Sequence, residues 1–456
     1  MIPSLTSSTR VHLVGVGGAG MSGIARILLQ RDHLVSGSDL RESRSLEELR
    51  VLGARVEIGH DSSHLGDAEV VVISTAVPPT NPEVLAARER GTVVLRRAEM
   101  LAQLMAHERA VLIAGTHGKT TTTSMTVVAL QAAGGDPSFA IGGALNDSGT
   151  NAHAGTDGRF IAEADESDRS FLVYRPDVAV VTNVEHDHPD EFADEQAVQQ
   201  AFRAFLGRRA IGAPAVVCVD DHGARQLADA VVGPVLRYGS DPRADVRVVT
   251  RNDGRHRLRI DGTEVARFRL GVPGHHNVLN ATAALAVVHA LGDDVEAAAA
   301  GLARFTGPTR RFQRLGESDG VVVVDDYAHH PTELRATLSA ARTLAPERLV
   351  LVVQPHRYSR TEVLGAELGR AAAAADLVVV TDVYASGEPP VPGVTGRLVA
   401  DAASAAGANV VFEAHLSDVV ATLVDRVRPG DLVLTTGAGD VTQVGPALLA
   451  ALQAGR

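Results

Sequence analysis

The chain has 456 residues, of which 45% are hydrophobic and 21% charged, and its formal net charge is −12. These proportions are ordinary for folded domains and exclude a disordered or fibrous protein, while the length predicts about three domains. The acidic balance excludes general nucleic-acid binding, which needs a basic surface that displaces counterions from phosphates.

The sequence shows no targeting or membrane segment. Its first residues lack the apolar core of a signal peptide, and no apolar run approaches the roughly 20 residues that a membrane helix needs. The single cysteine, Cys218, lies in an apolar run and is predicted to be a small core residue. One cysteine cannot form a disulfide within the chain, which is typical of a reducing compartment. We therefore expect a cytoplasmic protein with no membrane partner.

Short runs of Val, Ile and Leu alternate with longer alanine-rich stretches, a pattern typical of parallel α/β layers. Several runs are apolar on both faces, as buried parallel strands are. The alternating, charged segment 247–270 instead predicts an antiparallel hairpin insertion, with turns at Asp253-Gly254 and Asp261-Gly262. Strands are expected at 11–16, 33–39, 70–75, 110–115, 159–164, 178–183, 215–220, 320–327, 348–355, 376–384, 408–413 and 431–439.

Two boundaries divide this pattern into three parts. A helical segment at 96–108 precedes a new strand-loop-helix start, which predicts a boundary near residue 107. The segment 301–316 mixes Gly, Pro and several arginines between two α/β patterns, which predicts another near residue 308. The expected domains are 1–107, 108–308 and 309–456.

The first glycine-rich loop has Gly15, Gly17 and Gly20 at the spacing G-x-G-x-x-G, between a strand and a helix. Glycine permits the tight turn, and free N–H groups at the helix start attract a diphosphate. Asp39 ends the next strand, where this geometry binds a ribose hydroxyl. The motif indicates a diphosphate beside a ribose without identifying what is attached, and a turn needed only for helix packing remains an alternative.

The second loop lies in AVLIAGTHGKTTTTSM, residues 110–125, and contains Lys119. Of the 43 Lys and Arg residues in the chain, Lys119 alone is lysine. Gly118, Lys119 and Thr120 form a shortened relative of the phosphate loop G-x-x-x-x-G-K-[ST], in which the lysine contacts β and γ oxygens and the hydroxyl binds Mg²⁺. A compact ammonium fits where the larger fork of arginine does not, so a lysine kept here predicts a nucleotide-phosphate role.

Polar residues follow several later strands, where open α/β sheets bind ligands. The acidic cluster near Glu163 is typical of a solvated turn, but beside a phosphate loop it predicts a metal-binding carboxylate. Histidine is not the ligand that Mg²⁺ favours, so the residues alone leave His188 undecided. Asn277 and Asn280 begin a helix and fit either capping or contact with a base. The other polar residues at such junctions are Asp165, Glu166, Asp168, His186, Asp326, Tyr327, His329, His330, His356, Arg357 and Arg360.

Taken together, these motifs resemble the Mur ligases. The matching strings, in order from residue 15 to 440, are GVGGAGMSGIA, GTHGKTTT, EADESDRSF, TNVEHDH, HHNVLNATAA, GPTRRF, DDYAHHPTE, QPHRYSR and GAGD. Each string is weak alone, but the ordered set is specific, and DDYAHHPTE with QPHRYSR is most similar to the alanine-adding branch. The resemblance implies an α/β fold of three domains: an N-terminal Rossmann-like UDP-sugar domain, a central P-loop ATPase domain with a mostly parallel sheet, and a C-terminal Rossmann-like domain that closes over the site.

The resemblance implies an ATP-dependent amide ligase whose small-molecule substrates are UDP-N-acetylmuramate and L-alanine. The lactyl carboxylate attacks the γ-phosphate to give an acyl phosphate and ADP, and the amine of alanine then displaces phosphate. This is the first amino-acid addition in cytoplasmic peptidoglycan precursor synthesis, by a monomer or weak homodimer. Three alternatives remain open: a sister ligase that attaches a recycled tripeptide, an NAD-dependent oxidoreductase built on the first loop, and a non-catalytic nucleotide-binding protein.

The resemblance also implies roles for individual residues. The first loop becomes the cradle of the UDP diphosphate, and no nicotinamide is involved. Catalytic roles fall on Lys119, Glu163, His188 and His329, with Thr120, Glu163 and His188 as ligands of Mg²⁺. ATP is expected at Gly115, Thr116, His117, Gly118, Lys119, Thr120, Thr121, Asn277, Asn280, Arg311 and Asp326. The UDP-sugar is expected at Gly15, Gly17, Gly18, Gly20, Met21, Asp39, Ser74 and Thr75, and the amino acid at Tyr327, His329, Arg357 and Arg360.

One feature of the family cannot be present. Several Mur ligases position a second Mg²⁺ with a carbamylated lysine downstream of the metal-binding histidine, and this chain has no lysine after Lys119. Any second Mg²⁺ would need phosphates, substrate, water or a carboxylate such as Glu163. Activity is therefore expected to be independent of added bicarbonate.

Overall fold

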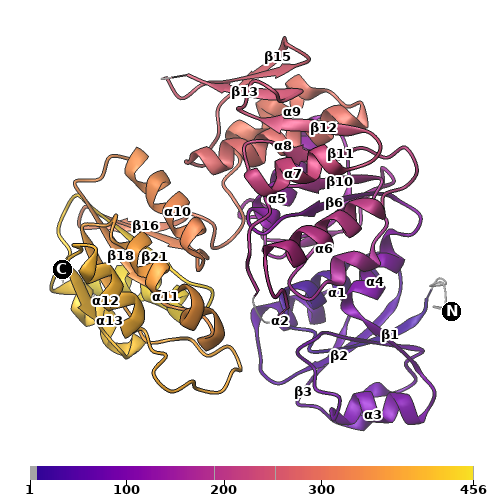
Figure 1. Ribbon diagram of the computed structural model, residues 1–456. Helices are drawn as coiled ribbons and strands as arrows, with labels where there is room; N and C mark the ends of the chain where they lie inside the picture. The colour runs from indigo at the N-terminus through magenta and orange to yellow at the C-terminus, as the bar shows by residue number, and fades with distance from the viewer. Residues whose placement is uncertain (1–7, 189–190, 252, 455–456) are drawn as a thin grey trace. The chain divides into compact units, whose positions relative to one another are not determined.

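The structure is a computed structural model that describes residues 8–188, 191–251 and 253–454. It contains three sheets, each covered by helices (Figure 1). No helix among the described residues is both long and apolar enough to span a membrane. The three α/β parts with mostly parallel sheets confirm the predicted fold class.

The first sheet has five parallel strands in the order β3-β2-β1-β4-β5. From β1 the chain first adds β2 and β3 on one side and then adds β4 and β5 on the other, so the strand order reverses at β1. Open α/β sheets bind ligands at such a point, beyond the carboxyl ends of the strands. Its strands are β1 (Arg10–Val14), β2 (Leu34–Asp39), β3 (Arg55–Ile58), β4 (Val70–Ile73) and β5 (Val93–Arg96). Its helices are α1 (Ala19–Gln30), α2 (Arg44–Val51), η1 (Ser62–Leu65), α3 (Pro82–Glu89) and α4 (Arg97–Met105).

The central sheet has ten strands in the order β15-β14-β13-β12-β11-β10-β6-β9-β7-β8. Its middle strands are parallel and fully buried, and Cys218 ends one of them as a buried free thiol, as predicted. The strands are β6 (Arg109–Ala114), β7 (Ser138–Ala140), β8 (Ala152–His153), β9 (Arg159–Glu163), β10 (Val178–Val181), β11 (Ala215–Cys218), β12 (Val235–Gly239), β13 (Val246–Thr250), β14 (His256–Ile260) and β15 (Thr263–Phe268). The helices are α5 (Lys119–Ala132), η2 (Ser170–Val173), α6 (Glu195–Gly207), α7 (His222–Ala230), α8 (His275–Leu291), α9 (Val295–Gly301) and η3 (Leu302–Arg304).

The antiparallel hairpin predicted at 247–270 is confirmed, with one strand more than a single hairpin has. The segment forms three antiparallel strands, and its first strand, β13, pairs in parallel with β12 and so extends the central sheet. Both predicted turns are present. Asp261 and Gly262, with φ of 49° and 80°, connect β14 to β15 in the left-handed conformation that a two-residue hairpin turn needs.

The third sheet has six strands in the order β16-β17-β21-β18-β19-β20, and only the edge strand β16 is antiparallel. Alternate residues of β18 enter separate cores: Leu351 packs with helices α10 to α12, and Val352 packs with α13 and α14. The strands are β16 (Gln313–Ser318), β17 (Val321–Asp326), β18 (Arg348–Val353), β19 (Leu377–Val380), β20 (Val410–Phe412) and β21 (Asp431–Thr436). The helices are α10 (Pro331–Thr343), α11 (Tyr358–Ala372), α12 (Arg397–Ala405), α13 (Leu416–Val424), η4 (Asp440–Gln443) and α14 (Val444–Ala454).

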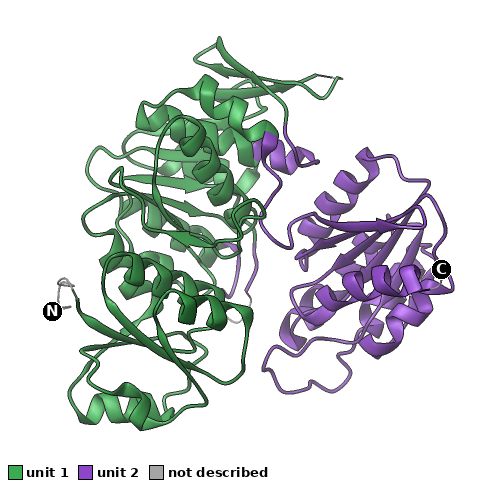
Figure 2. Cartoon of the chain, turned by 180° about the vertical axis from the view of Figure 1, so that it is seen from behind, with its two compact units in different colours: residues 1–185, 196–269, 280–303 green, residues 186–195, 270–279, 304–456 purple. Residues whose placement is uncertain are grey.

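The chain divides into two compact units (Figure 2). Unit 1 holds the first two sheets, and unit 2 holds the third sheet together with segments 186–195 and 270–279. Within unit 1, side chains tie the first sheet's helix α1 to the edge of the central sheet. Asn151 donates from Nδ2 to the Ala19 carbonyl at 2.7 Å, and Gln30 accepts the Ala154 N–H at 2.8 Å.

Candidate active site

The loop between β6 and α5 requires glycine at two positions. Gly115 has φ +141°, and a Cβ there would lie 1.9 Å from the hydroxyl oxygen of Thr182. Gly118 has φ +80°, and its Cβ would lie 2.9 Å from Oδ1 of Asn280. The backbone of the loop therefore lies in close contact with Thr182 and Asn280. In the described part of the chain no side chain caps the start of α5, so its first N–H groups remain available for phosphate.

Lys119 is held almost fully out of solvent, with 15% of its side chain exposed. Its Nζ donates to the Gly115 carbonyl at 2.8 Å and to Oε2 of Glu166 at 2.7 Å. Burial opposes the charge, but Glu166 and Asp165 outweigh it and raise the pKa of Lys119. Burial also raises the pKa of Glu166, to about 7. The sequence drew attention to Glu166 as part of an acidic cluster, but its pairing with the lysine was not predicted.

Thr120 and Glu163, two of the predicted metal ligands, lie together. The Thr120 hydroxyl donates to Oε2 of Glu163 at 3.0 Å, because β9, which ends at Glu163, pairs in parallel with β6. A hydroxyl and a carboxylate are the hard oxygen ligands that Mg²⁺ prefers, so this donor pair fits the ion. The third predicted ligand, His188, belongs to unit 2.

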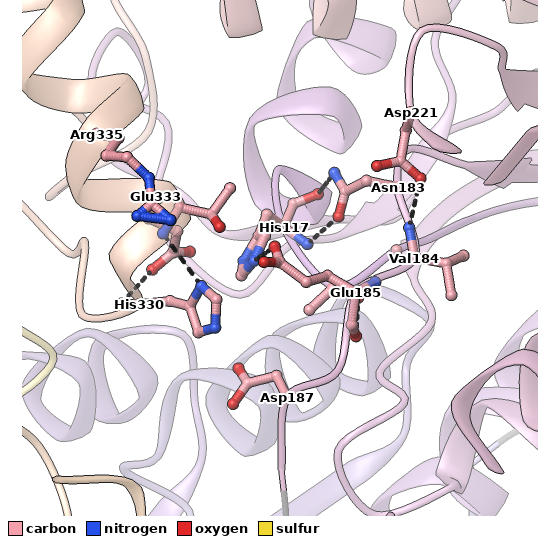
Figure 3. A network of polar contacts seen from close by, with 12 residues as sticks. His117, Asn183, Val184, Glu185, Asp187, Asp221, His330, Glu333 and Arg335 are labelled. Carbon is pink, nitrogen blue, oxygen red and sulfur yellow. Dashed lines mark hydrogen bonds and ion pairs between the residues drawn. The ribbon is translucent and has the colours of Figure 1, made fainter. Parts of the chain in front are cut away.

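Two residues of the segment after β10 that were not predicted as site residues, Asn183 and Glu185, contact the phosphate loop (Figure 3). Asn183 accepts the His117 N–H at 2.8 Å through Oδ1 and donates from Nδ2 to the His117 carbonyl at 3.0 Å. Oε2 of Glu185 lies 3.1 Å from Nε2 of His117. Asn183 and Glu185 belong to the polar string TNVEHDH, in which the histidines carried the prediction, and the string does not show which members reach the loop.

The two asparagines of α8 have different surroundings. Asn280 lies against Gly118 of the phosphate loop, which keeps it a candidate for nucleotide contact. Asn277 donates from Nδ2 to the Pro273 carbonyl at 2.7 Å, so this bond is local to the start of the helix. The sequence left capping and ligand contact open for both residues. The surroundings of Asn277 favour the local, capping role, and those of Asn280 favour contact with a ligand.

The first glycine loop follows β1, and its backbone is hydrogen-bonded to the carboxylate of Asp39. Gly15 has φ +76°, and the N–H of Gly17 donates to Oδ2 of Asp39 at 2.8 Å. A Cβ on Gly17 would lie 2.9 Å from the same oxygen, so any larger residue there would require the Asp39 side chain to move. Asp39 therefore contacts the loop as well as lying at the strand end where a ribose is expected. The remaining predicted residues near this edge are Gly18 and Gly20 at the start of α1, the buried Met21, and Ser74 and Thr75 after β4.

His329 follows β17 in unit 2 and is neutral at pH 7. Its Nδ1 lies 3.0 Å from the Tyr327 carbonyl; a carbonyl only accepts, so the proton is on Nδ1 and Nε2 is left as an acceptor. Burial lowers the pKa of His329 to about 4, although Glu333 opposes this. The rings of His329 and Tyr327 meet edge to face at 5.4 Å. His329 is therefore well oriented but weakly basic.

Arg360, predicted to bind the amino acid, pairs with a buried carboxylate in unit 2. Its Nε and Nη2 lie 3.2 and 3.1 Å from Oδ1 of Asp187, and the two side chains are 8% and 5% exposed. Burial opposes the charge on Asp187, but Arg360 and nearby histidines hold the pKa of Asp187 far below its usual value. The N–H of His188, a residue with φ +57°, donates to Oδ1 of Asp187 at 2.7 Å. Asp187 was not predicted, since nothing in TNVEHDH points to a partner so distant in sequence.

Asp326 and Arg311, both predicted near ATP, lie at the carboxyl end of β17. Asp326 accepts the N–H groups of Phe312 and Ala328 at 2.7 and 2.8 Å, and burial raises its pKa to about 6. The guanidinium of Arg311 lies 4.9 Å from the centre of the Tyr327 ring. Asp326 thus fixes the backbone of the loop that carries Arg311.

Arg357 starts α11 in a conformation that few residues other than glycine adopt. Its φ is +68°, and its N–H donates to the Tyr384 carbonyl at 2.8 Å. Tyr384 stacks on His356 with ring centres 5.7 Å apart. Such strain is concentrated at functional sites, which is in keeping with the predicted position of Arg357 beside the amino acid.

Family models match along most of the chain. The model described as "Mur ligase family, catalytic domain" matches residues 10–109, "Mur ligase middle domain" matches 113–288, and "Mur ligase, glutamate ligase domain" matches 310–439. The matched ranges follow one another in the order of the three sheets. Seven of the nine motif strings on which the sequence resemblance rested lie wholly inside these ranges, while GPTRRF at 307–312 and GAGD at 437–440 lie partly inside them.

Individual proteins match over nearly their full lengths. The chain is 54% identical to UDP-N-acetylmuramate–L-alanine ligase of Acidothermus cellulolyticus over 453 residues, 97% of this chain and 95% of the relative. The crystal structure of UDP-N-acetylmuramate-alanine ligase from Thermotoga maritima superposes with a TM-score of 0.83 at 27% identity, covering 98% and 100% of the two chains. A murein peptide ligase from Psychrobacter arcticus shares the fold, with a TM-score of 0.73 at 24% identity and coverage of 98% and 99%.

Proposed function

The chain belongs to the Mur ligase family, and from this premise we propose that it joins L-alanine to the lactyl carboxylate of UDP-N-acetylmuramate, converting ATP to ADP and phosphate. The observation that carries the proposal is the 54% identity, over 97% of the chain, to a ligase of that name. Members of the family are ATP-dependent, and the strand-loop-helix that contains Lys119 supplies the matching chemistry.

Two anions must approach each other in the first step, the carboxylate of the substrate and the γ-phosphate of ATP. A carboxylate oxygen bonds to phosphorus as the bond to ADP breaks, so positive charge has to be in place around the transferred group. Lys119 supports this role because its ammonium stays charged while it is buried beside the start of α5. The open N–H groups of α5 would hold the β and γ oxygens.

Thr120, Glu163 and His188 are the residues that would hold Mg²⁺. Bound there, the ion would offset the negative charge of the phosphates. The hydrogen bond between Thr120 and Glu163 keeps the two oxygens 3.0 Å apart, which supports the proposal that one ion could contact both.

In the second step the alanine nitrogen bonds to the acyl carbon and phosphate leaves. An amine attacks only after it has lost its ammonium proton. His329 is a weak base at neutral pH, since its pKa is about 4. We therefore propose that Nε2 of His329 orients the amine by accepting a hydrogen bond, with Tyr327, Arg357 and Arg360 nearby in the predicted amino-acid site. Closure of the C-terminal domain, which the family resemblance implies, would keep water from the acyl phosphate.

The decisive assay measures phosphate released from ATP in the presence of UDP-N-acetylmuramate, with and without L-alanine. We expect release that depends on both substrates and a product that contains alanine. Turnover with the recycled tripeptide in place of alanine would instead identify the sister peptide ligase, which the fold alone also allows. A hydride-transfer signal with NADH would restore the oxidoreductase alternative.

We propose a cytoplasmic location, because the substrates include ATP and the one cysteine is a buried free thiol. The expected state is a monomer or weak homodimer, which sedimentation over a range of protein concentrations would test.

A further inference from the structure

Arg97 is a half-buried guanidinium at the start of α4 in unit 1. Among residues 8–188, 191–251 and 253–454 it makes no hydrogen bond and no ion pair. Its charge acts on Asp165 across the unit, but the two are not within ion-pair distance. None of its nitrogens is among the described buried polar atoms that lack a partner, so its donors are open to solvent and to a ligand, and an arginine fork matches a phosphate or carboxylate in shape. The side chain therefore has the chemistry of a residue prepared for an anionic ligand.

The guanidinium lies against the first glycine loop. Nη1 of Arg97 is 3.0 Å, and its Cδ 3.1 Å, from the position that a Cβ on Gly20 would take. Gly20 is the last glycine of the G-x-G-x-x-G motif, so any larger residue there would displace the arginine. The same glycine that completes the diphosphate motif thus makes room for a cation beside it.

Arg97 also lines a pocket of about 190 Å³. It is lined by Thr75, which is one of the predicted UDP-sugar residues, and by residues of α4 and of the segment before η2. Its charged lining residues are Arg96, Arg97, Glu99, Asp168 and Arg169, three positive and two negative. Arg97 thus borders both the glycine loop, through Gly20, and a pocket that it shares with Thr75.

We propose that Arg97 is a substrate-binding residue that contacts the diphosphate of the UDP-sugar from the side opposite the backbone of the first glycine loop. This inference rests on the proposed function, which supplies the nucleotide-sugar. It adds a cation to a site for which the sequence predicted only glycines, Met21, Asp39, Ser74 and Thr75. The diphosphate is favoured over a carboxylate elsewhere in the substrate because the guanidinium touches the loop itself.

The test compares UDP with uridine, which lacks the phosphates, by titration calorimetry on the full chain. In Arg97→Gln we expect the Kd of UDP to rise about 10- to 100-fold, in line with loss of charge-assisted hydrogen bonds. The Kd of uridine should change less than about twofold, as should the KM of ATP. Arg88→Gln, which removes an exposed arginine from α3 in the same part of the chain, should change neither affinity and serves as the matched control.

Unchanged UDP affinity in Arg97→Gln would overturn the proposal, as would equal losses for UDP and uridine, which indicate a purely structural role. If Arg97→Gln does not fold, Arg97→Lys replaces it: the charge is kept and the fork lost, so a smaller but selective loss for UDP is expected, and no loss overturns the proposal. A wild-type chain that binds neither UDP nor UDP-N-acetylmuramate refutes the proposed function as well. UDP binding by the wild type with no effect of either variant refutes the role of Arg97 alone.

Discussion

The ammonium group of Lys119 donates hydrogen bonds to backbone carbonyls and to a carboxylate that lie in different directions around it. Two backbone carbonyls of the loop and Glu166 surround Nζ within 3.3 Å. A guanidinium is planar and larger than an ammonium. It therefore cannot fit in the same space and donate to the same three groups. A position that accepts only the smaller cation explains why this lysine persists in a chain that uses arginine at every other basic position.

Lys119→Arg is therefore expected to fold and to lose activity. We expect kcat to fall by about 100-fold or more, the usual loss when one charge-stabilising donor at a transferring group is misplaced. Steady-state phosphate release with saturating substrates measures the effect. Arg109→Lys, an exchange in the opposite direction at an exposed residue of β6, should leave kcat unchanged. Full activity in Lys119→Arg would contradict the assignment of the loop.

Amine-directed labelling offers a second measurement on the same side chain. Besides the amino terminus, only Lys119 can react, and its raised pKa and low exposure predict slow modification. ATP should slow the reaction of Lys119 further while leaving that of the terminus unchanged. Peptide mass spectrometry over time gives both rates in one sample. Equal rates for Lys119 with and without ATP would show that the nucleotide does not cover this amine.

Sequence patterns identified residues whose roles are set locally. The phosphate loop could be predicted because its glycines, lysine and threonine are contiguous and their spacing is fixed by the strand-to-helix turn. Glu166 and Asp187 could not be assigned their partners, because Lys119 and Arg360 reach them through the tertiary fold. An acidic residue after a strand looks the same in sequence whether it faces solvent or a buried cation.

At the scale of elements, the Arg360–Asp187 pair joins helix α11 to the segment 186–195. Removing one partner of a buried pair leaves an uncompensated charge, so Arg360→Gln and Asp187→Asn should each lower the free energy of unfolding by about 3–5 kcal/mol. The double variant should lose less than the sum of the two. Urea denaturation measures these values. The exposed pair Arg335–Glu367 also involves α11 and is the control: Arg335→Gln should cost at most about 1 kcal/mol.

Helix α3 is anchored at its start by Glu83, a fully buried carboxylate. Ser38 donates to it at 2.6 Å, and Nδ1 of His60 and of His64 each lie at 3.1 Å. Burial opposes ionisation, but the contacts with His12 and Ser38 outweigh it and hold the pKa of Glu83 below its usual value. Strand β2, which contributes Ser38, and helix η1, which contributes His64, are thereby joined to α3.

A depressed carboxylate pKa contributes stability above the unfolded value of about 4.3, and this contribution is lost as the pH falls through the folded value. Glu83→Gln should therefore lower the free energy of unfolding by about 1–3 kcal/mol at neutral pH. The difference from wild type should shrink as the pH falls below the unfolded value of about 4.3, and should be lost once the pH has passed below the lowered pKa of the folded carboxylate. Urea denaturation at several pH values tests this, with the exposed Glu89→Gln as control. A difference that does not change with pH would contradict the assigned role of the charge.

Strands were predictable where they are buried on both faces. Every apolar run that predicted a strand forms one, including those at the centres of the sheets. The missed strands β3, β5, β12 and β16 are short or partly exposed and carry charged or polar residues. The missed strands β7 and β8 have only three and two residues. They form because a neighbouring strand offers hydrogen bonds, and this information does not lie in their own sequence.

At the scale of the whole molecule, the presence of one lysine in 456 residues limits the chemistry available. A carbamylated lysine downstream of His188 cannot form, so activity should not depend on dissolved bicarbonate. Initial rates in buffer freed of carbon dioxide should match those with added bicarbonate. A relative with the downstream lysine is the appropriate comparison, and a clear stimulation of this chain would contradict the expectation.

The order of the three α/β parts could be predicted from the sequence, and the composition of the two compact units could not. Segments 186–195 and 270–279 belong to unit 2, which otherwise begins at residue 304. A division of the sequence into contiguous stretches has no way to assign them there, since their neighbours on both sides belong to unit 1. The pairing of Asp187 with Arg360 is one contact that links the segment 186–195 to the rest of unit 2.

The bond between Lys119 and Glu166 has a further consequence for how a nucleotide would enter and leave. The ammonium already has an internal counter-anion, so phosphate binding at this loop is an exchange of one anion for another. The net affinity then reflects the difference between two ion pairs, which is smaller than the strength of either. When the phosphate departs, Glu166 can take its place again, and the loop returns to a neutralised state without waiting for a solvent ion.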